Sequence, residues 1–439
     1  MGTASGQNAT GRDRFGSLQL TVIVLCALIV VFDGFDTQAI AYVAPMIGRE
    51  WGVEASSFGP IFAAGLLGLA GGNLFLGPIA DRFGRKTVIL GSVAVFGGFA
   101  LATAFASGLT ELLVFRFITG LGLGAALPNV IALTSEYAPE RYRATAVMIM
   151  FCGFPLGSVI GGFIAPPLME ASGWQAVFVI GGVVPLLMLP VLFFMLPESA
   201  RFLATKGRNE RRISRILHRL GTGQTAEELV AEVHAEQTGK GKGLAVVRLF
   251  TNGLGTSTVL LWTAFFTNLL VMYFLVNWLP TLIEQAGLPL RTGILSVALM
   301  NLAGVVGAIA LSRLLDLWNP YWLLGINYGV SAIFIALLAT GTSSGYLALI
   351  AAAFVGVGVV GGQIGCNAIA AAQYPTLIRA TGVGWALGIG RIGAISGPLI
   401  GGSLLAAGWT PQAMILLAVV PILMAALAIT VLGKVTQRG

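Results

Sequence analysis

Residues 18–46 read LQLTVIVLCALIVVFDGFDTQAIAYVAPM, an apolar run whose only charged residues are Asp33 and Asp36. A helix needs about 20 mostly apolar residues to cross the hydrocarbon core of a bilayer, and this run is longer than that. A cleavable signal peptide has a shorter apolar region without carboxylates, so the run does not fit one. The stretch predicts a membrane-spanning helix that holds two acidic side chains.

The composition of the whole chain extends this prediction. Of the 439 residues, 56% are hydrophobic and only 10% are charged, whereas about one-quarter of a soluble domain is charged. Hydrocarbon is spanned only by helices or closed barrels, and long apolar runs without a ten-residue alternation indicate helices. We therefore expect an all-α membrane protein with twelve spans. They are predicted at residues 18–46, 57–79, 87–107, 110–134, 144–168, 174–196, 257–283, 292–313, 322–342, 345–372, 380–405 and 411–433.

The basic residues predict the orientation. Of the 25 Lys and Arg residues, all but four fall in segments on one side of the membrane. Arg49 and Arg291 fall on the other side, and Arg116 and Arg391 fall within spans. Because Lys and Arg mark cytoplasmic loops, both termini are expected in the cytoplasm. The formal charge of +7 then reflects topology, and we expect a lipid bilayer rather than nucleic acid as partner.

Residues of catalytic and metal chemistry are sparse. Three cysteines lie in separate apolar runs, which does not suit a disulfide framework or a thiolate metal site. His218 and His234 both fall in the polar segment between the sixth and seventh spans, so no histidine can relay protons inside the membrane. In that same segment, basic residues from Arg211 to Arg219 predict an amphipathic helix. We expect neither an enzyme nor a bound cofactor.

The two halves of the chain repeat each other. Pro45 matches Pro280 at an offset of 235 residues, and Arg143 in RYRATAV matches Arg379 in LIRATGV at 236. Further matches at these offsets are Asp81 with Asp316, Gly120 with Gly356, Gly122 with Gly358, Trp174 with Trp409, and Pro185 with Pro421. The repeat predicts two pseudo-symmetric six-helix bundles, residues 18–196 and 251–433. A cytoplasmic loop, 197–250, joins them, and cytoplasmic tails, 1–17 and 434–439, flank them.

Duplicated six-helix halves are typical of secondary transporters, which bind substrate near the midplane between the halves and alternate their access. A duplicated membrane scaffold or sensor is the alternative. The charges inside the spans favour transport, because polar groups in hydrocarbon are expensive and mark functional sites.

Asp33 and Asp36 are the first of these charges. Their i, i+3 spacing places them on one helix face, and each costs roughly 2.5–3.5 kcal/mol to insert near a helix centre. Burial favours the protonated carboxylate and a nearby guanidinium favours the ionised one, so both are candidates for carrying a coupled proton. Ion pairs with a purely structural role are the alternative. At the offset of 235, the positions equivalent to Asp33 and Asp36 are Asn268 and Val271, so only the first half has acidic residues there.

Two arginines complete the embedded charges. Arg116, near the outer end of the fourth span, either pairs with Asp33 or Asp36 or extends toward the headgroups. Arg391 lies about 12 residues into the eleventh span, close to the midplane, where its planar fork matches a carboxylate. It is a candidate substrate anchor, with an ion pair to the first span as the alternative.

The loop after the second span reads GPIADRFGRKTVIL, Gly77 to Leu90. Its G-x-x-x-D-R-x-G-R-K pattern resembles the signature of the major facilitator superfamily, with a weaker copy at residues 312–320. The resemblance implies that fold, and a cytoplasmic latch of acidic and basic groups that closes in the outward-facing state. Glu136 is expected to join the latch with Arg143. The residues assigned to gating are Gly77, Asp81, Arg82, Arg85, Glu136, Arg143, Asp316 and Arg379.

The D-G-F-D motif of the first span resembles one branch of that superfamily, the aromatic acid:H+ symporters. Four further stretches share the resemblance: GLGAALPNVIALTSE, LPESARFL, NWLP and IRATGVGWALGIGRIGAISGPLIGG. Within the branch, the chain is most similar to carriers of hydroxybenzoate, gentisate or hydroxyphenylpropionate. This implies an inner-membrane symporter, a functional monomer, that imports an aromatic carboxylate with protons.

The resemblance also implies roles for residues. Asp33 and Asp36 would serve as coupling or substrate-site acids, Asp81 as latch and Arg391 as carboxylate anchor. Arg116 is a further candidate for substrate binding. Tyr273 and Asn277 of the seventh span are candidates for contacting the ring, and the amides of Asn129, Gln363 and Asn367 could bind a ring hydroxyl.

Two rival functions remain. LPESARFLATKGR also resembles a sugar-porter signature, so a sugar, polyol or other organic-acid carrier is the first rival. Embedded arginines suit an anion better than a sugar. GAISGPLIGG resembles the antiporter motif, but it falls in the eleventh span rather than the fifth, which disfavours drug or metabolite antiport.

Overall fold

The computed structural model describes residues 16–206, 210–220, 224–238, 247–250, 254–340, 344–374 and 376–436. Residues 1–15 and 437–439 of the predicted tails lie outside this description. Within it, 12 helices are long and apolar enough to cross a membrane, and each begins and ends within five residues of its predicted span. The prediction of an all-helical, twelve-span protein is confirmed.

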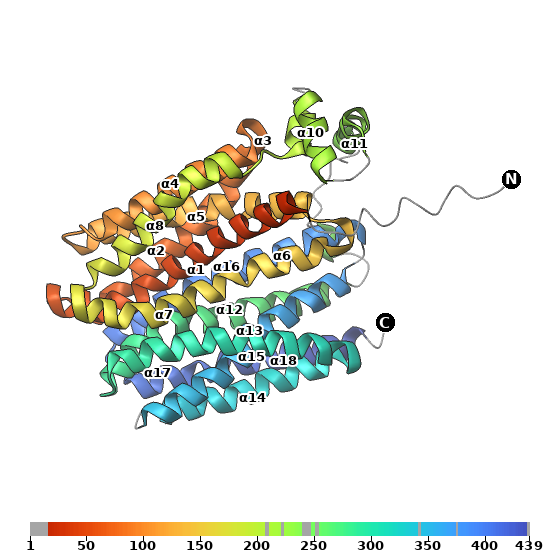
Figure 1. The fold of residues 1–439 in the computed structure, drawn as a ribbon. Coiled ribbons are helices and arrows are strands. Elements are labelled where there is room, and N and C mark those ends of the chain that lie inside the picture. The colour runs from red at the N-terminus through yellow and green to blue at the C-terminus, as the bar shows by residue number, and fades with distance from the viewer. Residues whose placement is uncertain are drawn as a thin grey trace.

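The spans form two bundles that lie side by side (Figure 1). The first half contains α1 (Ser17–Trp51), α2 (Phe58–Gly71, continued by η2, Gly72–Leu76), α4 (Arg85–Thr103), α5 (Leu109–Tyr137), α6 with α7 (Arg143–Phe151, Gly153–Ser172) and α8 (Gln175–Met195). The second half contains α12 (Leu254–Gln285), α13 (Leu290–Leu317), α14 (Pro320–Thr340), α15 (Gly345–Gln373), α16 (Thr376–Ala406) and α17 with α18 (Pro411–Leu417, Val419–Thr436).

The repeat is visible in the turns at one end of the bundles. Gly52 and Gly287 end repeat-related helices in the left-handed region, with φ of 63° and 94°. Gly173 and Gly408 form a second pair, with φ of 78° and 76°. L-residues other than glycine rarely adopt this region, so both halves use the same turn chemistry at equivalent positions. We call this end the distal side.

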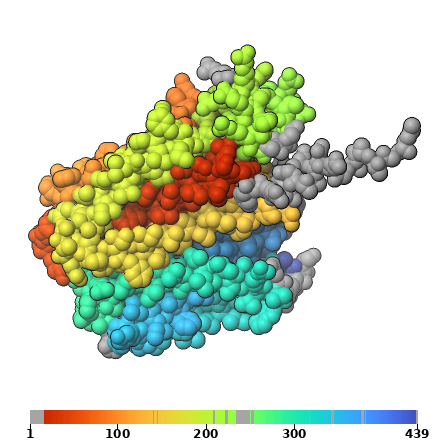
Figure 2. Space-filling model, viewed as in Figure 1, coloured from red at the N-terminus to blue at the C-terminus, as the bar shows by residue number. Residues whose placement is uncertain are grey.

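The opposite end is the terminal side, because it carries both described chain ends and the central segment (Figure 1). That segment folds into α9 (Ala200–Thr205), α10 (Glu210–Leu220) and α11 (Ala226–Thr238). The predicted amphipathic helix is α10, which buries Ile213, Ile216 and Leu217 in a cluster with apolar residues of the first half. In the space-filling view, α10 and α11 project beyond the bundle on the side of the first half (Figure 2).

The two halves touch on the distal side. Arg49 of α1 pairs with Glu284 of α12 at 2.6 Å. The ring of Phe62 on α2 meets Trp278 on α12 edge to face, with centroids 5.2 Å apart. Where α2 crosses α16, the backbones approach so closely that a Cβ on Gly402 would lie 2.9 Å from the carbonyl oxygen of Ser56.

The contact ends partway along α16. Gly402, Pro398 and Ala394 lie on one face of this helix and meet the first half at Gly59 and Leu66. Two turns nearer the terminal side, the same face is uncovered. There Leu387 is 41% exposed, and a Cβ on Gly388 would have no heavy atom within 4 Å. The halves therefore close on the distal side and part toward the terminal side.

Candidate functional site

Asp36 and Arg116 form a buried ion pair between α1 and α5. Their side chains are only 1% and 3% exposed. Arg116 donates from Nη1 to Asp36 Oδ1 at 2.9 Å and from Nη2 to Oδ2 at 2.8 Å. It also donates from Nη2 to the Asp36 carbonyl at 3.0 Å, and its guanidinium lies over the Phe178 ring. Of the two acids predicted as partners, the structure selects Asp36, and Arg116 does not extend toward the headgroups.

Asp33 has a different environment one turn away. It is 4% exposed, and the hydroxyl of Thr37 donates to its Oδ1 at 3.2 Å. Among the described residues it makes no ion pair. Its carboxylate borders a small apolar hollow lined by Ile29, Val30, Leu123, Ala126, Leu127 and Val130. Asp33 is therefore a buried acid whose one hydrogen-bond partner is neutral, which is the setting in which a carboxylate can gain or lose a proton. Thr37 was not among the residues predicted for this site, although its i+4 spacing from Asp33 signals such a bond.

Arg391 faces this site from the other half. It is half-buried on the uncovered face of α16, where the halves begin to part. Gly390 and Gly393 beside it pack against α12 at Phe265 and Phe266. Its positive charge acts on Asp33 across the interface, yet within the described chain it makes no hydrogen bond or ion pair. Its guanidinium fork is thus available to an anion, whereas both terminal nitrogens of Arg116 are held by Asp36.

A small cavity lies beside Arg116, bordered mostly by the first half and, from the second half, by Asn277. Its volume is about 20 Å³, which is room for about one water molecule. Arg116 lines it, and the Nε of this arginine is buried without a partner among the described residues. The other lining residues come from α1, α2, α5 and, in the second half, α12: Thr37, Ile40, Ile61, Phe62, Gly65, Leu66, Leu69, Gly120, Leu123 and Asn277.

The remaining candidates for ring contacts separate into two groups. Asn277 lines the cavity, although its amide also donates to the Tyr273 carbonyl at 2.7 Å. Tyr273 packs with Leu66 at the interface between the halves. Asn129 does not face the site, because its amide donates to the backbone at Ala125 (2.8 Å) and Gly77 (3.4 Å).

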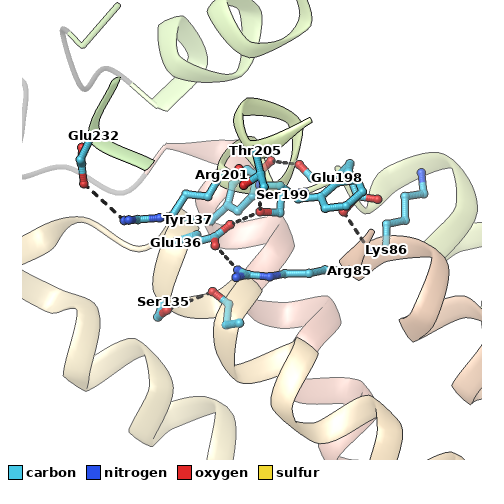
Figure 3. A network of polar contacts seen from close by, with 12 residues as sticks. Arg85, Lys86, Ser135, Glu136, Tyr137, Glu198, Ser199, Arg201, Thr205 and Glu232 are labelled. Atoms are coloured by element: carbon cyan, nitrogen blue, oxygen red, sulfur yellow. Dashed lines mark hydrogen bonds and ion pairs between the residues drawn. The ribbon is translucent and has the colours of Figure 1, made fainter. Parts of the chain in front are cut away.

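Two gating residues of the first half, Arg85 and Glu136, belong to a polar network on the terminal side (Figure 3). Glu136 at the end of α5 pairs with Arg85 of α4, and Ser199 donates to it at 2.5 Å. The expected partner, Arg143, is instead exposed to solvent. The predicted latch role of Glu136 and Arg143 stays a prediction, and the ion pair that Glu136 makes in this structure is with Arg85, another of the predicted gating residues.

Glu198 extends the network to the central segment (Figure 3). Its carboxylate accepts from the backbone N–H of Lys86 at 3.1 Å, and its carbonyl accepts from the Tyr137 hydroxyl at 2.8 Å. Arg201 of α9 pairs with Glu232 of α11 at 3.5 Å. These contacts tie α4, α5, α9 and α11 together within one side of the molecule and do not bridge the two halves.

Other gating candidates lie apart from this network. Asp81 and Arg82 are exposed, and Arg82 lies over the neighbouring Phe83 ring. Gly77 is buried, and a Cβ there would lie 2.8 Å from Pro128 of α5, so it permits a close helix approach. Arg379 is exposed and donates to the Tyr374 carbonyl at 3.3 Å. The side chain of Asp316 lies outside the described part.

Comparison with known proteins identifies the architecture. A family model described as Major Facilitator Superfamily matches residues 26–363. The chain belongs to the Major Facilitator Superfamily. This member is 42% identical over 421 residues to the 4-hydroxybenzoate transporter of Pseudomonas putida, covering 95% of this chain and 93% of the relative. It is 41% identical to the gallate transporter of the same organism, covering 96% and 93%.

A third relative is the 3-(3-hydroxy-phenyl)propionate transporter of Escherichia coli K12. It is 39% identical to this chain, and the match covers 96% of this chain and 95% of the relative. Solved structures agree on the fold. The xylose transporter of E. coli in an inward-open conformation aligns with a TM-score of 0.75 at 18% identity. The alignment covers 94% of this chain and 95% of the xylose transporter. A bacterial homologue of the lysosomal transporter Spinster aligns with a TM-score of 0.71 at 17% identity. That alignment covers 97% of this chain and 99% of the homologue. The relatives are transporters, which confirms the prediction that this superfamily member is not an enzyme.

Proposed function

We propose that the protein is a proton-coupled symporter that imports a hydroxylated aromatic carboxylate into the cell by alternating access. The relatives at 39–42% identity, which are named for hydroxybenzoate, gallate and hydroxyphenylpropionate, support this substrate class. The observation that carries the coupling is the contrast between the two acids of α1. Asp36 is neutralised by Arg116, while Asp33 is buried with only a hydroxyl partner and faces the charge of Arg391.

This arrangement links proton and substrate binding through competition for one cation. When Asp33 is ionised, it attracts Arg391. When Asp33 takes up a proton, Arg391 is released to bind the carboxylate of the substrate, and the buried site is left with no net change in charge. Proton and anion then cross together, because either alone would leave an uncompensated charge between the halves.

Sidedness completes the proposal. By the excess of Lys and Arg in its loops, the terminal side faces the cytoplasm of the cell and the distal side faces outward. A structure closed distally and parted on the terminal side then corresponds to the state that releases substrate inward. One chain supplies both halves of the site, so we propose a functional monomer in the inner membrane with the proton as its only coupling ion.

The test is uptake by purified protein in proteoliposomes with labelled 4-hydroxybenzoate. An inward proton gradient is expected to drive accumulation above equilibrium, and a protonophore is expected to abolish it. Equal uptake with and without the gradient would contradict the coupling. Absence of any binding or uptake of aromatic acids, together with uptake of sugars, would contradict the substrate class.

A further inference from the structure

The second half carries a chain of three hydrogen-bonded amides that begins at a buried asparagine and that the proposed proton and carboxylate site does not use. Asn268 on α12 is fully buried and donates from Nδ2 to Gln363 Oε1 on α15 at 2.8 Å and to the Val359 carbonyl at 3.2 Å. Gln363 donates from Nε2 to Asn367 Oδ1 at 3.3 Å. The chain of amides therefore runs from the core of the half toward the terminal side.

This amide chain is incomplete. The Oδ1 of Asn268 is buried and has no hydrogen-bond donor among the described residues. A buried acceptor without a partner is destabilising, so such groups are rare in folded proteins unless a ligand or water satisfies them. Gln363 and Asn367, by contrast, are only half-buried. Polar side chains within a span face a water-filled opening rather than lipid, which makes these two reachable from the parted side.

The amide chain lies at the level of the proposed anchor. α12 and α16 run in the same direction, and the glycines beside Arg391 contact α12 at Phe265 and Phe266, less than one turn from Asn268. Gln363 and Asn367 bracket that level on α15. A ligand whose carboxylate binds Arg391 would therefore have the amide chain beside it in the same half.

The repeat shows that this polarity is particular to the second half. The offset of 235 relates Asn268 to Asp33, and the offset of 236 relates Gln363 and Asn367 to Leu127 and Ile131. In the first half, Asp33 and Leu127 border the apolar hollow. Equivalent positions thus hold an acid in an apolar setting in one half and a string of amides in the other.

We propose that the Asn268–Gln363–Asn367 chain recognises the ring hydroxyl of the substrate, an inference that rests on the proposed function. A phenol both donates and accepts, so its hydroxyl can donate to a second lone pair of the Gln363 or Asn367 amide oxygen and accept from an amide N–H. Gln363 and Asn367 contact the hydroxyl, and Asn268 is a positioning residue that orients Gln363. The half with the acid handles the proton, and the half with the amides selects hydroxylated over plain aromatic acids.

The experiment measures inhibition constants for benzoate and 4-hydroxybenzoate against labelled 4-hydroxybenzoate in proteoliposomes. Gln363→Leu keeps the size of the side chain and removes its hydrogen bonds. This variant is expected to raise the inhibition constant of 4-hydroxybenzoate by about tenfold or more. The inhibition constant of benzoate is expected to stay within about threefold of the wild-type value. Asn327→Leu is the matched control, because Asn327 is a half-buried amide of the same half that lies on α14 and donates to the Gly358 carbonyl at 2.9 Å. It is expected to leave the ratio of the two constants unchanged.

Equal weakening of both acids by Gln363→Leu would overturn the inference, as would a wild-type protein that binds the two acids equally. If the leucine variant does not reach the membrane, Asn367→Ala at the half-buried end of the chain serves instead, with the same expected loss of preference. A wild-type protein that binds neither acid would refute the proposed function, and that outcome is distinct from loss of selectivity alone.

Discussion

The buried pair of Asp36 and Arg116 shows how one residue contact sets the chemistry of its neighbours. A bidentate pair of this kind fixes the position of α1 against α5. It leaves the second acid of α1 without a cation of its own, so the two carboxylates can take different roles although they lie one turn apart.

Breaking this pair is expected to destabilise the protein. Asp36→Asn or Arg116→Gln leaves one charge buried without a partner, which costs about 3–5 kcal/mol. Either single variant should lower the melting temperature in detergent, followed by tryptophan fluorescence. The double variant should recover part of the loss because no unpaired charge remains. A double variant less stable than both single variants would show that the pair acts in some other way.

Asp33→Asn is expected to separate exchange from accumulation. Asparagine imitates the protonated acid permanently, so Arg391 stays available to the substrate and no proton is released. Counterflow of labelled 4-hydroxybenzoate between loaded vesicles should persist, while accumulation driven by a proton gradient should be lost. Gradient-driven accumulation at the wild-type level in this variant would remove Asp33 as the proton carrier.

Arg391→Lys is expected to weaken substrate binding while keeping the charge. Lysine lacks the planar fork that binds a carboxylate through two parallel hydrogen bonds. We expect the half-saturating concentration of 4-hydroxybenzoate to rise by about tenfold or more, measured by uptake at saturating proton gradient. Unchanged affinity would rule out Arg391 as the anchor.

The sequence predicted part of this site and not the rest. The cost of charge in hydrocarbon was enough to single out Asp33, Asp36, Arg116 and Arg391 before any coordinates. Which acid pairs with Arg116 depends on the rotation of α1 against α5, and hydropathy carries no information on that rotation. The same limit explains why Arg85 was not predicted as the ion-pair partner of Glu136.

At the scale of helices, the contact between α2 and α5 depends on glycine. A Cβ on Gly124 would lie 2.8 Å from the backbone nitrogen of Asn73 and still closer to the Leu69 carbonyl. Small residues of this kind let helix backbones approach and pack in a membrane, where apolar burial gives no driving force between helices.

Gly124→Ala is therefore expected to lower the free energy of unfolding of the first half. The expected loss is about 1–3 kcal/mol, which is the cost of overpacking a well-packed core. The matched control is Gly98→Ala on α4, where a Cβ would have no heavy atom within 4 Å. The control should be neutral or slightly stabilising. The melting temperatures of the two variants are measured in detergent. Equal melting temperatures for Gly124→Ala and Gly98→Ala would show that α2 can move away from α5 at little cost in free energy.

Hydropathy located every span because length and apolarity are properties of each segment alone. It did not indicate that α2 changes to a π-helical turn at Gly72–Leu76 before η3 at Gly77–Ile79. That change depends on the close approach of Gly72 and Gly77 to α5, which is a tertiary contact. The span predicted at 57–79 is therefore confirmed in position, and its change of helix type was not predicted.

At the scale of the whole molecule, closure of the distal side combines apolar contacts with one ion pair. Arg49 is 63% exposed and Glu284 23%, so their pair is expected to contribute at most about 1 kcal/mol. Arg49→Gln should therefore shift the ratio of distally open to closed molecules by up to about fivefold. The closed state should remain populated because the contacts of Phe62 and Gly402 persist.

Spin labels on Ala171→Cys and Ala407→Cys, both exposed on the distal side in different halves, report this shift by pulsed electron resonance. The native cysteines are first replaced, since Cys152 is exposed. Arg49→Gln is expected to increase the population at longer distance, and the charge swap Arg49→Glu with Glu284→Arg is expected to restore the short one. If neither variant changes the distances, the pair has no part in closure.

The ion pair of Arg49 and Glu284 joins residues that are 235 positions apart, which is the spacing of the internal repeat. The two side chains are therefore copies of one position, facing each other across the axis that relates the halves. In an assembly of two identical six-helix chains, such a position would meet its own duplicate, arginine against arginine or glutamate against glutamate, and would repel. Opposite signs at this position require the two copies to be encoded separately, so this closure depends on the halves having diverged.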